Sequence, residues 1–157
     1  METIEQYLPH HPFFAGMKHH LVMEVAQCSR RLEVPGGKPL FYQGDHADAM
    51  YVIRSGRMDL RVHRRSGRGM TVDTVEAGDV VGWSWLVPPH RWMFDAFALQ
   101  DTDVIVLEGG QLKQKCETDP ALGYAFYARV AQVMHQRLEA ARARLVEQHE
   151  GFHGHLH

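Results

Sequence analysis

Long apolar runs are missing from this sequence of 157 residues. No stretch approaches the roughly 18 apolar residues that a membrane-spanning helix needs, and the polar beginning METIEQYLPHH does not have the pattern of a secretory signal. The two cysteines, Cys28 and Cys116, lack the spacing of a metal site or a redox motif. We therefore expect a cytoplasmic chain that does not enter a membrane and that keeps both thiols reduced.

Neither sign of charge predominates, because the formal net charge is −2 with histidine neutral. Such a balance provides no overall field that would select nucleic acid or a membrane surface. The arginines are nevertheless uneven, and one stretch holds Arg54, Arg57, Arg61, Arg64, Arg65 and Arg68. This stretch predicts a solvent-exposed hairpin, and the functional alternative is a docking patch for an acidic protein partner.

Catalytic and metal-binding groupings are also sparse. The sequence shows no Ser-His-Asp or paired-carboxylate arrangement, and the expected strands contribute only one histidine, His63. The alternating histidines of HEGFHGHLH belong to residues 149–157, which we expect to form a flexible tail with weak metal affinity at most. We therefore expect no enzyme activity and no metal site. A metal-holding barrel enzyme of the cupin kind is the rival class.

Short apolar segments broken by glycine-rich turns fill residues 29–108. Within them Tyr51, Ile53, Leu60 and Val62 alternate as the inward face of a strand does. Strands this short, with turn signals about every ten residues, are typical of a β-sandwich, roll or barrel and not of a parallel sheet. We expect a mainly β fold, preceded by helices in residues 1–28.

A helical period replaces the strand pattern in residues 109–148. Asp119 is suited to cap the long helix, and Pro120 suits its first position. An apolar seam with heptad spacing follows, made of Tyr124, Tyr127, Ala131, Met134, Leu138, Ala141, Leu145 and Gln148. The seam predicts a homodimer through this helix, and packing against its own sheet is the alternative. Residues 1–148 are then a single domain.

One segment, GDVVGWSWLVPPHRWMFDAFA at residues 78–98, holds all three tryptophans of the chain. Its Pro-Pro pair excludes a regular helix or a central strand. The segment is either an aromatic part of the core or the wall of a ligand site.

Two motifs give the chain a family resemblance. The stretch YQGDHADAMYVIRSGRMDL, through Gly44, Tyr51, Ile53 and Gly56, and the turn EAGDVVGWS, through Gly78, Asp79 and Gly82, resemble the cyclic nucleotide-binding domain of the CRP/FNR family. The resemblance covers roughly residues 12–148. It implies a double-stranded β-helix or jelly roll (the cyclic nucleotide-binding β-roll), a dimerising C-terminal helix and a regulatory role.

The resemblance also implies a phosphate-binding cassette, from which this sequence departs. In the family a glutamate that follows the cassette glycine accepts the ribose hydroxyl, and an arginine followed by Ser or Thr binds the cyclic phosphate. Here Trp83 follows Gly82, Arg91 stands near the arginine position, and Trp92 replaces the Ser or Thr. An indole only donates hydrogen bonds, so Trp83 cannot replace the glutamate, whereas Ser84 or Asp95 could supply an acceptor.

Two functions remain open at this stage. The first is a non-catalytic sensor that binds cAMP, cGMP or a related small molecule in an aromatic pocket made of Gly82, Trp83, Ser84, Trp85, Arg91 and Trp92. The second is a ligand-free dimeric interaction module whose pocket is filled by its own tryptophans.

A haem sensor, as some family members are, is a further class. Its candidate iron ligands would be His63, His90 or Cys28, and no neighbouring sequence motif supports any of them. Only HEGFHGHLH follows residue 148, so we expect no helix-turn-helix domain and no direct DNA binding.

Overall fold

A computed structural model describes residues 2–67 and 69–154. The chain begins with helix α1 (Ile4–Tyr7), two 3-10 turns, η1 (Leu8–His10) and η2 (Pro12–Phe14), and helix α2 (His19–Ala26). Eight strands follow, with bounds β1 Ser29–Val34, β2 Pro39–Phe41, β3 Ala49–Ser55, β4 Arg57–His63, β5 Gly69–Glu76, β6 Val80–Val81, β7 Asp95–Ala98 and β8 Thr102–Glu108. The 3-10 turn η3 (Trp83–Leu86) lies between β6 and β7, and helices α3 (Gly109–Thr118) and α4 (Pro120–Gly154) end the chain.

The strands form two antiparallel four-stranded sheets, with the orders β1-β8-β3-β6 and β2-β7-β4-β5. This arrangement is the β-roll that the sequence predicts, so the predicted fold class is confirmed. Glycines shape its turns. Gly56 joins β3 to β4 with a φ of 95°, and a Cβ there would lie 2.6 Å from the carbonyl oxygen of Asp101. Both the positive φ and the close approach favour glycine at that position.

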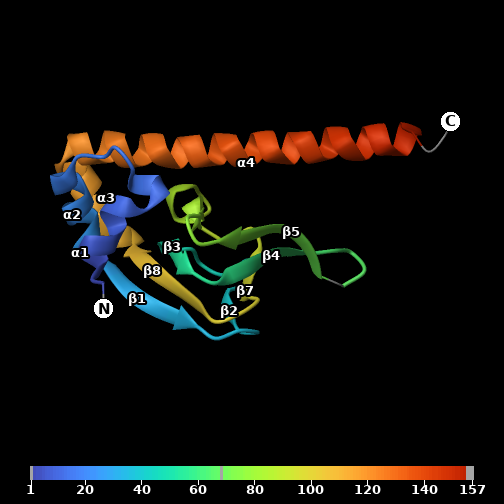
Figure 1. The fold of residues 1–157 in the computed structure, drawn as a ribbon, viewed down its shortest axis with the longest axis horizontal. Helices are drawn as coiled ribbons and strands as arrows, with labels where there is room; N and C mark the ends of the chain where they lie inside the picture. The colour runs from blue at the N-terminus through green and yellow to red at the C-terminus, as the bar shows by residue number, and fades with distance from the viewer. Residues whose placement is uncertain (1, 68, 155–157) are drawn as a thin grey trace.

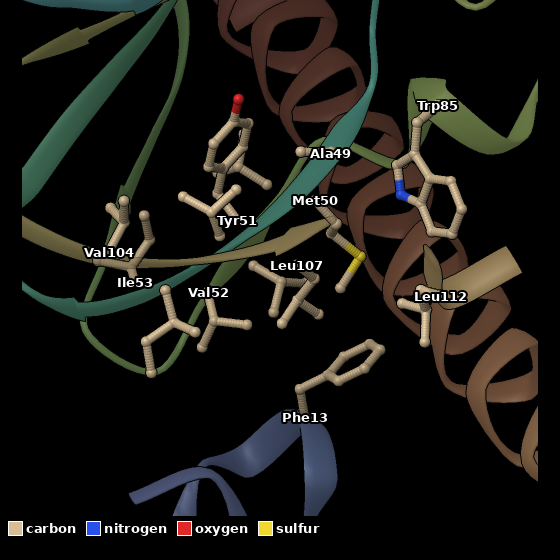
Figure 2. Packing of buried hydrophobic residues seen from close by; sticks show 14 of the residues in the cluster. Phe13, Ala49, Met50, Tyr51, Val52, Ile53, Trp85, Val104, Leu107 and Leu112 are labelled. Atoms are coloured by element: carbon tan, nitrogen blue, oxygen red, sulfur yellow. The ribbon is translucent and has the colours of Figure 1, made fainter. Parts of the chain in front are cut away.

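The core is built from the inner faces of both sheets and from the helices at the two ends of the chain. Figure 2 shows Met50 and Val52 of β3 and Leu107 of β8 close to Leu112 of α3 and Phe13 of η2. All five side chains are buried. Helical and strand segments from distant parts of the sequence thus share one core.

Helix α4 runs along one side of the molecule and extends past the body of the roll (Figure 1). Its first turns bury Leu122, Phe126 and Val130. The helix also makes polar contacts with the roll, where three arginines donate hydrogen bonds to main-chain carbonyls: Arg129 to Phe13 (2.9 Å), Arg137 to Val80, and Arg144 to Val72 (3.0 Å). We call these three residues the arginine ladder. It holds the part of α4 from Arg129 to Arg144 against η2, β6 and β5.

Helix α4 continues to Gly154, through residues for which the sequence predicted a flexible tail. A helix that has already formed adds one hydrogen bond for each further residue, and no proline interrupts these positions. The last predicted tail residues, 155–157, lie outside the described part of the chain. None of the helices in the described part of the chain combines the length and the hydropathy that a membrane-spanning segment requires.

Candidate functional site

The segment between β6 and β7 contains a sharp local chain path. Gly82 has a left-handed φ of 95° and caps η3, and the Pro88–Pro89 peptide bond that follows is cis. The chain then returns beside residues 44–47, where the Ala47 amide donates to the carbonyl of His90 (2.7 Å) and the Trp92 amide donates to that of Asp45 (2.9 Å). His90 itself has a left-handed φ of 59°, and Arg91 and Trp92 then run antiparallel to residues 44–47 at the edge of the roll.

Trp92 points into the roll and is only 3% exposed. Its ring stacks on Phe41 with centroids 3.9 Å apart and an angle of 10° between the planes, and the Tyr51 ring lies 6.0 Å away. A Cβ at Gly82 would lie 2.8 Å from the Trp92 ring. The indole therefore fills the space directly beside the cassette glycine.

Arg91 has the opposite orientation, because successive side chains of an extended segment point to opposite faces. Its side chain is exposed, and its guanidinium donates to the carbonyl oxygen of Gly44 at 2.9 Å. Arg91 and Trp92 are therefore adjacent in sequence, but Arg91 points to solvent and Trp92 points into the roll.

Trp83 lies toward α4, where it is partly buried. The Arg137 guanidinium sits over its ring, 4.7 Å from the centroid, and also donates to the Val80 carbonyl. Burial lowers the pKa of Arg137 from its usual value, although Asp73 and Asp79 act in the opposite direction. Trp83 thus connects the cassette to the long helix through a cation–π contact.

Trp85 belongs to the core between η3, α3 and α4. Its ring lies 6.4 Å from that of Phe126, and a Cβ at Gly109 would lie 2.9 Å from it. Figure 2 shows it on the same side of the core as Met50 and Leu112. Its indole nitrogen is buried without a hydrogen-bond partner among the described residues. We infer that Trp85 anchors η3 in the core.

The two possible replacements for the family's glutamate have different surroundings. Asp95 is buried, its Oδ1 accepts from the Gln43 amide at 2.6 Å, and its Oδ2 lies 3.0 Å from His63 Nε2. Both of its oxygens are thus engaged. Ser84 is buried within η3, where its carbonyl accepts from the Val87 amide.

The structure brings five of the six predicted site residues into or beside η3 and gives the three tryptophans different surroundings. Two partners of the tryptophans were not predicted from the sequence: Phe41, which stacks on Trp92, and Arg137, which lies over Trp83. Phe41 carried a weak signal as an apolar residue just before the family motif. Arg137 carried none, since it appeared only as a charge outside the helix seam. Among the described residues, no group of three or more His, Cys, Asp or Glu is placed to hold a metal.

A β-roll with helical ends, a glycine-initiated cassette and a long C-terminal helix is the architecture of the cyclic nucleotide-binding class of domain. The family model for the cyclic nucleotide-binding domain matches residues 31–119, more than half of the chain. The chain belongs to the cyclic nucleotide-binding domain family, and its regulatory domain is of the CRP type. The resemblance stated from the sequence is thereby confirmed.

Individual relatives agree with this assignment. The Cyclic AMP receptor protein of Thermus thermophilus is 32% identical over 97 residues, which are 61% of this chain and 44% of the relative. A crystal structure of a cyclic nucleotide-binding protein from Geobacter metallireducens has a TM-score of 0.76 at 26% identity, covering 88% of this chain and 99% of that one. The crystal structure of the Thermus thermophilus catabolite activator protein has a TM-score of 0.71 at 26% identity, and the match covers 87% of this chain and 62% of that one. The chain spans less than half the length of the first of these relatives.

Proposed function

We propose that this chain is a regulatory domain that keeps its cassette closed with its own Trp92 and works as a dimeric interaction module without a cyclic nucleotide. Of the two functions left open by the sequence, the geometry favours this one. The observation that carries it is the Trp92 indole, stacked on Phe41 beside Gly82 and 3% exposed. The role is regulatory and not catalytic.

The energy needed to open the cassette supports this proposal. Moving a buried indole into water exposes about 150–250 Å² of ring surface, which costs about 4–6 kcal/mol at 25 cal/mol per Å². Stacking a base on an aromatic side chain returns about 1–3 kcal/mol. A nucleotide that displaced Trp92 would therefore have to recover the difference from polar contacts.

Those polar contacts are weak in the present arrangement. Arg91 would have to leave the Gly44 carbonyl to reach a phosphate in the interior, and Trp83 offers no acceptor to a ribose hydroxyl. The alternative function, in which cAMP or cGMP binds with Arg91 on its phosphate, is supported by the name of the Thermus thermophilus relative, the Cyclic AMP receptor protein.

The proposed dimer forms through the exposed apolar seam of α4. Tyr124, Leu138 and Leu145 remain exposed on a helix whose other face packs on the roll. A second surface for a protein partner is the β4–β5 hairpin, which projects beyond the body of the roll (Figure 1). Arg64 and Arg65 are exposed near its tip, and charge complementarity suits them to an acidic partner.

Calorimetric titration of the purified chain with cAMP, and separately with cGMP, tests the closed cassette. We expect no saturable heat up to about 1 mM ligand, which corresponds to less than about 4 kcal/mol of binding free energy. Saturable heat that disappears in Arg91→Ala, and persists in the matched variant Arg64→Ala, would contradict the proposal and restore the sensor function.

A further inference from the structure

A groove separate from the cassette interior opens between η2, the turn that joins β5 to β6, and α4. Its volume is about 320 Å³, within the usual range for small-molecule sites. Pro12, Phe13 and Val80 give it an apolar floor, and Gly78 and Asp79 form one wall. The opposite wall is α4.

The α4 wall of this groove is rich in hydrogen-bond donors. It presents Arg129, Gln132, Gln136 and Arg137. The ladder contacts of the two arginines each use one terminal nitrogen, to Phe13 and Val80 respectively. A guanidinium has five N–H donors, so both retain donors for a ligand.

The positive charge of these arginines is only partly compensated. Neither Arg129 nor Arg137 forms an ion pair with a carboxylate among the described residues. Asp73 and Asp79 act on Arg137 from beyond ion-pair distance, and Asp79, which lines the groove, accepts from the Glu76 amide through its Oδ2. A partly buried guanidinium without an ion-pair partner is stabilised by an incoming anion.

The groove does not compete with the proposed dimer. Its α4 residues, Arg129, Gln132, Gln136 and Arg137, are all outside the heptad seam that contains Tyr124, Ala131, Met134, Leu138 and Leu145. A partner helix on the seam therefore leaves the groove open.

We propose that this groove binds a small organic anion through a phosphate or carboxylate group, held by Arg129 and Arg137 and oriented by the amides of Gln132 and Gln136. This inference goes beyond the proposed function and does not depend on a closed cassette. Arg137 also contacts Trp83, so an anion in the groove changes the surroundings of a tryptophan. Binding is therefore visible in Trp83 fluorescence as well as in heat.

The test is titration of the intact chain with pyrophosphate and, in parallel, with citrate, at constant ionic strength. The two probes distinguish a phosphate-bearing from a carboxylate-bearing ligand. We expect saturable heat with at least one of them, accompanied by a fluorescence change that Trp83→Phe removes. Absence of saturable binding by both probes up to about 10 mM would overturn the proposal.

Two matched pairs of variants locate the site. Gln136→Glu places a negative charge in the groove at an exposed helix position and should weaken binding about tenfold, whereas Gln114→Glu, at an exposed position of α3 outside both the groove and the seam, should not. Arg129→Gln should weaken binding by a similar factor, whereas Arg144→Gln removes another ladder contact away from the groove and should leave binding intact. Equal losses within either pair would overturn the assignment.

Discussion

Replacing Trp92 with alanine lowers the free energy of unfolding by about 3–5 kcal/mol, the range for removing a large aromatic side chain from a core. The loss follows from the stack on Phe41 and from the contact with Gly82, which leave an apolar void when the indole is deleted. Urea unfolding at one fixed protein concentration measures it, since a dimer's stability depends on concentration.

Trp83→Ala is the matched control for this change, because Trp83 belongs to the same cassette but is only partly buried. We expect it to cost less than Trp92→Ala, with the loss of one cation–π contact to Arg137 contributing about 0.5–2 kcal/mol. Equal losses in the two variants would contradict the assignment of Trp92 as the residue that fills the interior.

Leu138→Arg separates the proposed dimer into monomers. Leu138 is 50% exposed on α4 and lies in the middle of the heptad seam. An arginine there brings two like charges together at the helix pair and removes its apolar contact, so we expect the dissociation constant to rise by about 100-fold or more. Sedimentation velocity over a range of concentrations measures this rise.

Val146→Arg provides the control for that experiment. Val146 is 55% exposed on the same helix, one position after the seam residue Leu145. The added charge is identical but lies outside the seam, so dimerisation should persist. If both variants dissociate, or if the wild-type chain sediments as a monomer, the seam of α4 is not the dimer interface.

Most of the fold could be predicted from local signals in the sequence. Glycine turns and short alternating segments indicated the roll because both constraints act within a few residues, as Gly56 and β4 illustrate. Asp119 and Pro120 marked the beginning of α4 for the same reason. The end of α4 was less predictable, since a polar helix can extend for several residues without any apolar pattern to reveal it.

The candidate site could be located from the sequence but not described. The motif around Gly82 located the cassette. It could not predict that the three tryptophans of this segment would have three different environments. Trp92 faces inward because residues 90–92 pair with residues 44–47, a long-range contact that no local pattern reveals. Arg137 reaches Trp83 across 54 positions of sequence and was likewise invisible in the helix pattern alone.

The most direct test of the closed cassette is the fluorescence of Trp92 itself, obtained as the difference between the wild-type chain and Trp92→Phe. We expect a blue-shifted contribution that acrylamide hardly quenches and that cAMP does not change, because the indole is stacked on Phe41 and 3% exposed. A red-shifted, readily quenched contribution, or one that shifts when cAMP is added, would show that the cassette is open.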